Sequence, residues 1–173
     1  MGQTTPFTRY ICEASKSRRE VFDIRNITEL FHQYKDDVYR LALSYTRSRE
    51  VAEDVCQTVF LKLMEQTKIE PGKEKAWLMR VTVNECNSLL RSCWWKRTVS
   101  LDEPTLGTLM HTNEVLDAVM TLEPKYRVVL YLHYYEGLTT KEISSLLHIT
   151  QSGVTSRLSR AREMLKNKLK EDE

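Results

Sequence analysis

The chain has 173 residues and nearly balanced charge, with 26 Lys and Arg against 24 Asp and Glu. This balance argues against a histone-like protein held to DNA by bulk charge, since such binding needs a large cationic excess. Hydrophobic residues make up 41% of the chain, which argues against wholesale disorder, and no stretch approaches the roughly 18 apolar residues of a membrane span. The N-terminus, MGQTTPFTRYICEAS, lacks the apolar run of a signal peptide. We therefore expect a soluble cytoplasmic protein.

Turn-forming and metal-binding residues are both sparse. With five Gly and four Pro, the chain lacks the frequent turn signals of a β-sandwich or barrel, so an all-α fold is expected. The four cysteines form no CxxC pair and have no His at zinc-finger spacing. We expect reduced, partly buried thiols, with no metal and no cofactor.

The N-terminal half predicts a tail followed by a three-helix bundle. Residues 1–26 carry mixed charge without periodicity and are expected to form a tail, for which no function is assigned. Apolar residues at steps of three and four begin near Thr28, restart near Val51, and resume after the Pro71-Gly72 loop with Trp77, Leu78, Val81, Cys86, Leu89 and Leu90 as inner positions. These elements predict a helical domain over residues 27–97.

A polar stretch at 98–113 (TVSLDEPTLGTLMHTN) predicts a linker to a second domain, 114–173. There, Leu116 begins a short helix, and Pro124 opens another whose inner positions run to Tyr135 before Gly137 ends it. Thr139-Thr-Lys-Glu142 spells a capping box. The turn His148-Ile-Thr150 then leads to a last helix with Val154, Leu158, Ala161, Leu165 and Leu169 on its inner face. We expect His148 to tolerate a positive φ.

A short helix, a three-residue turn and a longer helix together predict a helix-turn-helix, whose second helix enters the major groove of DNA. The outer face of that helix carries amide, hydroxyl and guanidinium groups, which bond base edges and phosphates. Residues 151–170 hold six cations and one anion, so the positive charge is concentrated on one element. The predicted DNA-binding residues are Gln151, Ser152, Thr155, Ser156, Arg157, Arg160 and Arg162.

Two segments also resemble a known family. GLTTKEISSLLHITQSGVTSRLSRAREMLKNKL looks like the fourth conserved region of bacterial sigma factors, and VAEDVCQTVFLKL followed by AWLMRVTVNECNSLLR looks like the second. Small size and two modules in this order resemble the extracytoplasmic-function (ECF) subgroup of the sigma-70 family. The resemblance covers about residues 28–170.

This resemblance implies a dissociable specificity subunit of RNA polymerase. In such proteins the N-terminal module binds the clamp of the beta-prime subunit and captures an unpaired −10 base, whereas the C-terminal module reads the −35 element and docks on the flap of the beta subunit. By position, Asp54 and Gln57 match the clamp contacts. Arg80 and Asn84 are candidates for the −10 base pocket, and Arg91, Lys96 and Arg97 for contacts with its phosphates.

The resemblance further implies an anti-sigma partner, often membrane-bound, that holds the protein inactive. No catalytic signature is present, such as a phosphate loop, GxSxG or HExxH, so we expect neither an enzyme nor a small-molecule substrate. One alternative is an ordinary helix-turn-helix regulator whose N-terminal bundle senses a ligand or dimerises. Another is an interaction protein that kept the fold without binding DNA.

Overall fold

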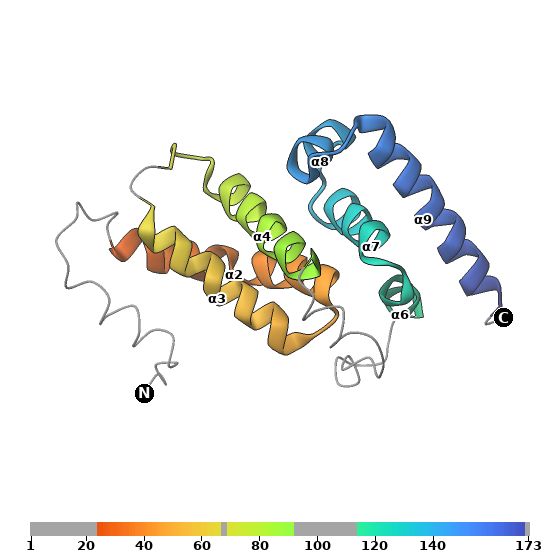
Figure 1. Ribbon diagram of the computed structural model, residues 1–173, viewed down its shortest axis with the longest axis horizontal. Helices are drawn as coiled ribbons and strands as arrows, with labels where there is room; N and C mark the ends of the chain where they lie inside the picture. The colour runs from red at the N-terminus through yellow and green to blue at the C-terminus, as the bar shows by residue number, and fades with distance from the viewer. Residues whose placement is uncertain (1–23, 67–68, 92–113, 172–173) are drawn as a thin grey trace.

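The computed structural model describes residues 24–66, 69–91 and 114–171, and every regular element in these ranges is helical. Figure 1 shows two bundles side by side. The first contains α2 (Ile24–Thr46), α3 (Arg49–Glu65) and α4 (Glu74–Arg91); the second contains α6 (Glu114–Thr121), α7 (Pro124–Leu130), the π-helix η1 (Tyr131–Tyr135), α8 (Thr140–Leu147) and α9 (Gln151–Glu171). The all-α expectation is confirmed for these residues. The predicted linker and most of the predicted tail lie outside them.

The first bundle follows the predicted periodicity, with two differences. Helix α2 begins at Ile24, inside the expected tail, because the buried Ile27 extends the apolar stripe one turn before Leu30. In α4 the buried positions are Leu78, Met79, Thr82, Val83 and Cys86. The predicted inner residues Trp77, Val81, Leu89 and Leu90 instead pack at the edge of the core. Thr82 can occupy the centre because its hydroxyl donates to the Leu78 carbonyl at 2.8 Å, which satisfies its polar group.

The second bundle departs from a simple helical period where α7 passes into η1. The Glu136 amide donates to the Tyr131 carbonyl, five residues back, at 3.1 Å, so this turn is wider than an α-helical one. The prediction that Tyr135 continues the inner stripe was wrong, since Tyr135 is 55% exposed. Leu116, at the start of the predicted short helix, is exposed, and Ala118 is the buried residue of α6.

The two bundles pack against each other, with α2 against α7 and α4 against α8. Their buried apolar side chains form one continuous cluster. Within this contact lies a buried cation, Arg127, which is 2% exposed. The sequence pattern predicted two modules but gave no sign of this packing.

Candidate nucleic-acid and protein interfaces

A capping box starts the first helix of the helix-turn-helix, as predicted. The Thr139 hydroxyl oxygen accepts from the Glu142 amide at 3.3 Å, and the Glu142 carboxylate accepts from the Thr139 amide at 2.8 Å. Hydrogen bonds from the Thr139 side chain and backbone hold the pKa of Glu142 below its ordinary value. These bonds satisfy amide groups that the helix itself leaves free and fix where the short helix α8 begins.

The turn that follows sets the direction of α9. His148 ends α8 with φ 54° and ψ 43°, the left-handed conformation expected from the sequence, and the Ile149 amide donates to the Ser144 carbonyl at 3.2 Å. Ile143 on α8 is fully buried, as is Val154 on α9, in two helices that pack together. The predicted helix-turn-helix is therefore confirmed.

Thr150 caps the N-terminus of α9, where its hydroxyl accepts from the Gly153 amide at 3.1 Å. A Cβ added at position 153 would lie 3.1 Å from the same hydroxyl oxygen. Glycine there leaves room for the cap, a reason for its place near the start of this helix that the sequence pattern did not reveal.

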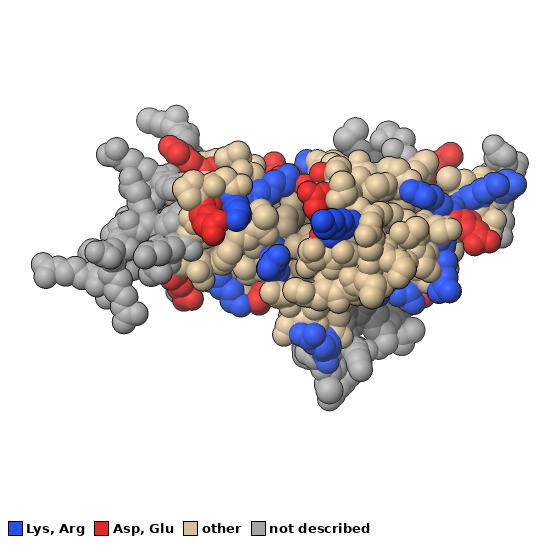
Figure 2. Space-filling model, turned by 90° about the horizontal axis from the view of Figure 1, so that it is seen from above, with Lys and Arg blue, Asp and Glu red and all other residues tan. Residues whose placement is uncertain are grey.

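The predicted −35 contacts lie on the outer face of α9 with one partial exception. Arg157 is half-buried, whereas the others are exposed: Gln151, Ser152, Thr155, Ser156, Arg160 and Arg162. The charge of Arg157 reaches Tyr45 at the end of α2, where it opposes the larger effect of burial, which raises the Tyr45 pKa. In Figure 2, Lys and Arg are spread over the visible face, and several lie at the right, the side on which α9 lies in Figure 1.

Two of these side chains are held in position by neighbours in their own bundle. The Gln151 amide nitrogen donates to the Thr140 hydroxyl at 2.8 Å. Arg162 donates through Nε to the Tyr134 hydroxyl at 2.7 Å, with its guanidinium carbon 5.6 Å from the ring centroid. Tyr134 is 63% exposed and belongs to this surface. The sequence pattern does not reveal Tyr134 because its pairing with Arg162 crosses from η1 to α9.

Asp54 and Gln57, the predicted clamp contacts, are both exposed on α3. Leu61 follows on the same face and is one of the exposed large apolar side chains. Phe60, on the core-facing side of the helix, is buried. Leu61 was not among the predicted contacts, although its spacing of seven from Asp54 marks the same helix face.

The predicted −10 contacts Arg80, Asn84 and Arg91 are exposed on α4. Their spacing of four and seven residues places them along one helix face. Trp77 lies one turn before Arg80, half-buried against the core. Lys96 and Arg97 lie outside the described residues. The structure thus brings an aromatic ring, two cations and an amide to one face of α4.

No helix in the described ranges is long and apolar enough to cross a membrane. The same residues hold no group of His, Cys, Asp and Glu suited to a metal ion. Cys56 and Cys86 are free thiols, and burial raises their pKa to about 11 and about 12.

Comparison with known families matches both halves of the chain. Residues 30–96 match the family model described as Sigma-70 region 2, and residues 112–165 match that described as Sigma-70, region 4. The chain is 31% identical over 153 residues to the ECF RNA polymerase sigma factor SigM of Bacillus subtilis, covering 81% of this chain and 93% of the relative. It is 29% identical over 155 residues to the ECF RNA polymerase sigma factor SigE of Mycolicibacterium smegmatis, covering 82% of this chain and 60% of the relative.

Two solved structures share the fold. The sigma factor RpoE of Bartonella quintana, in complex with the anti-sigma factor NepR, gives a TM-score of 0.67 at 22% identity over 86% of this chain and 99% of that one. CnrH, in complex with the cytosolic domain of CnrY, gives 0.61 at 19% identity over 96% and 99%.

Proposed function

Because the chain belongs to the sigma-70 family of RNA polymerase sigma factors, we propose that its two bundles divide promoter recognition between the −10 and −35 elements. It is an alternative sigma factor that directs RNA polymerase to promoters. An ordinary helix-turn-helix regulator does not account for a region 2 match upstream of the helix-turn-helix.

The observation that carries the assignment of the −35 element is the outer face of α9. A helix capped by Thr150 presents Gln151 and Thr155 close to its N-terminus, with exposed cations further along. In a helix-turn-helix the N-terminal residues of the second helix contact base edges, while cations contact phosphates. On this basis we assign the seven predicted residues of α9, six exposed and Arg157 half-buried, to the −35 element.

The first bundle would contact polymerase and the −10 strand through different helices. Asp54, Gln57 and Leu61 give α3 an exposed face with one acid, one amide and one apolar group, which suits a polar protein surface with an apolar centre. On α4, Arg80 and Asn84 can bond a base edge or a phosphate beside the Trp77 ring. Arg91 continues this face toward Lys96 and Arg97.

An anti-sigma partner is part of the proposal. One solved structure of the same fold is the sigma factor RpoE in complex with the anti-sigma factor NepR, and another is CnrH in complex with the cytosolic domain of CnrY. The exposed faces of α3 and α9 are the surfaces that such a partner would cover. We place the chain with RNA polymerase in the cytoplasm, as a subunit without catalysis of its own.

In vitro transcription with core polymerase on genomic fragments tests the function. We expect the chain to bind core and to produce discrete start sites that core alone does not. Arg160→Glu should lower transcript yield, whereas Lys125→Glu, a reversal at an exposed residue of α7, should not. A chain that fails to bind core, or that binds duplex DNA as a dimer without polymerase, would refute the proposal.

A further inference from the structure

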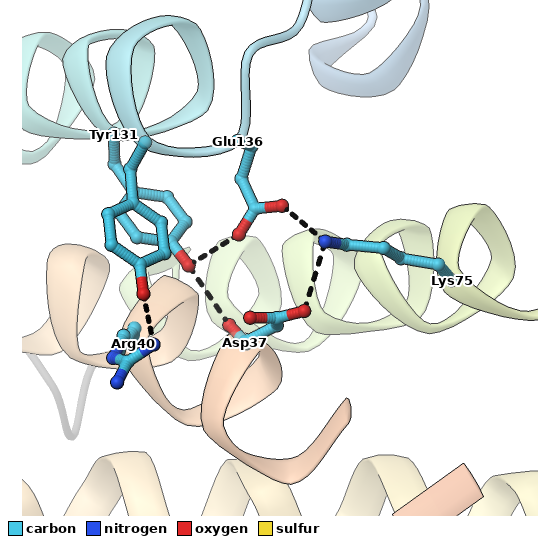
Figure 3. Close-up of polar contacts among 6 residues, drawn as sticks. Asp37, Arg40, Lys75, Tyr131 and Glu136 are labelled. Atoms are coloured by element: carbon cyan, nitrogen blue, oxygen red, sulfur yellow. Dashed lines mark hydrogen bonds and ion pairs between the residues drawn. The ribbon is translucent and has the colours of Figure 1, made fainter. Parts of the chain in front are cut away.

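Three tyrosines in η1 face two different neighbours. The rings of Tyr131 and Tyr135 stack with their centroids 5.1 Å apart, and both side chains contact α2. The Tyr131 hydroxyl lies 3.4 Å from the Asp37 carbonyl, and Arg40 donates to the Tyr135 hydroxyl, on the side of η1 that Figure 3 shows. Tyr134, by contrast, is 63% exposed and faces α9. The wide π turn thus leaves one tyrosine available to the helix that we place in DNA.

Arg162 on α9 is the partner of Tyr134. Its Nε donates to the Tyr134 hydroxyl at 2.7 Å, and its guanidinium carbon lies 5.6 Å from the centroid of the ring. Both contacts are with a neutral group. Among the residues that the structure describes, no carboxylate lies within ion-pair distance of Arg162. The tyrosine therefore fixes the direction of the guanidinium without neutralising its charge.

His133 restricts the Tyr134 ring. The two rings meet edge to face, with centroids 4.9 Å apart and planes at 72°. His133 is half-buried, and its Nδ1 lies 3.0 Å from the Leu138 carbonyl. Because a carbonyl oxygen only accepts, Nδ1 carries the hydrogen of this bond. The imidazole is thereby fixed and gives the tyrosine ring a rigid neighbour, so part of the ordering that a DNA contact requires is present before DNA binds.

The pair leaves hydrogen-bond donors for an anion. The Tyr134 oxygen accepts from Arg162, so its own O–H is left to donate. Within the described part of the chain, Arg162 makes its hydrogen bond through Nε alone, which leaves the N–H groups of Nη1 and Nη2. One neutral and one cationic donor thus lie side by side. Phosphate oxygens in DNA accept from both tyrosine and arginine side chains, and bonds from a cation to a phosphate are among the stronger ones.

The position of Arg162 along α9 directs the pair to the DNA backbone. Arg162 lies 11 residues after Gln151, which is about three turns along the helix and about 20° around its axis, on the same side as this proposed base contact. Its Cα is about 16 Å beyond that of Gln151, whereas the major groove is only about 8.5 Å deep. Helical side chains lean toward the N-terminus, which brings the guanidinium back to the phosphates that border the groove.

We propose that Tyr134 and Arg162 form a single binding site for one phosphate of the −35 duplex, in which Tyr134 both orients the guanidinium and donates its own O–H. The inference rests on the proposed function, since it needs α9 to lie in the major groove. Arg160 is about 200° around the axis from Arg162 and so faces the opposite strand. Because the phosphates of every sequence are alike, this site adds affinity for DNA without adding specificity.

Binding of holoenzyme, reconstituted from core polymerase and the full chain, to promoter duplexes tests the site. Each duplex carries one methylphosphonate, an uncharged substitute for a phosphate, at successive positions on either strand of the −35 element. Tyr134→Phe removes the hydroxyl and keeps the ring beside Arg162, whereas Arg162→Ala removes the cation. The matched control is Tyr135→Phe, the same substitution at another exposed tyrosine one position away, whose hydroxyl accepts from Arg40 on α2.

On the unmodified promoter, we expect Tyr134→Phe to weaken affinity about threefold and Arg162→Ala about fivefold. Because the two side chains act together, the double variant should lose less than the product, about 15-fold. At one phosphate position the methylphosphonate should weaken wild-type binding, and there neither variant should weaken it further. Arg160→Ala should lose its effect at a phosphate of the other strand. Tyr135→Phe should depend on the same phosphates as the wild type.

Two results would overturn the site. One is unchanged promoter affinity in Tyr134→Phe. The other is a Tyr134→Phe or Arg162→Ala variant that keeps its full effect on every methylphosphonate probe, since the pair would then only support the fold. If Arg160→Ala weakens binding while Tyr134→Phe and Arg162→Ala do not, the site fails and the −35 assignment of α9 stands. A chain that does not load onto core polymerase refutes the proposed function, and the phosphate site with it.

Discussion

Arg160 on α9 allows a test of how the helix meets DNA. It lies nine residues after Gln151, which at 1.5 Å per residue is about 13 Å along the axis. The major groove is about 8.5 Å deep, so with Gln151 at the base edges Arg160 lies at the level of the phosphates. We therefore expect Arg160→Ala to weaken the binding free energy by about 1 kcal/mol, roughly fivefold in affinity, on every promoter alike. The slope of log affinity against log salt should become less steep by about 0.9.

Gln151→Ala provides the contrast. The Thr140 hydroxyl already orients the Gln151 side chain. Removing that side chain should therefore weaken the binding free energy by about 1–3 kcal/mol on the cognate −35 sequence alone. The assay is binding of reconstituted holoenzyme to two templates that differ only at −35, each over a series of salt concentrations. If Arg160→Ala changes the preference between the templates while the salt slope stays the same, the placement of α9 argued above is wrong.

Three further predictions concern the rest of the chain. Asp54→Ala should weaken binding to core polymerase several-fold with no change in melting temperature, whereas Glu53→Ala, at another exposed acid one position away, should change neither. Titration against labelled core measures the binding. Thr139→Ala should lower the free energy of unfolding by about 1 kcal/mol at pH 7. Because the folded-state pKa of Glu142 lies below 4.5, this difference from wild type should persist above that pH and shrink as the pH falls through the folded-state pKa. Urea unfolding at pH 7 and at a pH below that pKa measures the difference. Cys86, fully buried with its pKa raised to about 12, should resist alkylation at pH 8 until the chain unfolds, as peptide mapping would show; rapid labelling in the native state would contradict the core assignment.

Much of the second bundle could be predicted from local spacing. The capping box at Thr139, the positive φ at His148 and the inner stripe from Val154 follow from residues within one or two helical turns of each other. Such features depend on backbone geometry that neighbouring side chains set directly. For the same reason the outer residues of α9 could be predicted as candidate DNA contacts from the sequence.

The apolar periodicity did not predict which residues are buried where several helical turns pack against the same core. In α4 the core centres on Thr82, which a count of apolar residues passes over, and in η1 a wide turn carries Tyr135 to the surface. Both depend on hydrogen bonds that a hydrophobic pattern does not contain: one satisfies a buried hydroxyl, the other spans five residues.

The amino-acid order alone thus determined which segments are helical, which faces are apolar and which helix carries the concentrated positive charge. Only the tertiary structure decided that the two bundles touch. Arg127 and its partner Ser44 are 83 positions apart, and Lys75 meets Glu136 from the other bundle. No local spacing relates such residues, because their contact depends on how two separately patterned surfaces fit, and the free energy of that fit appears only when both have folded.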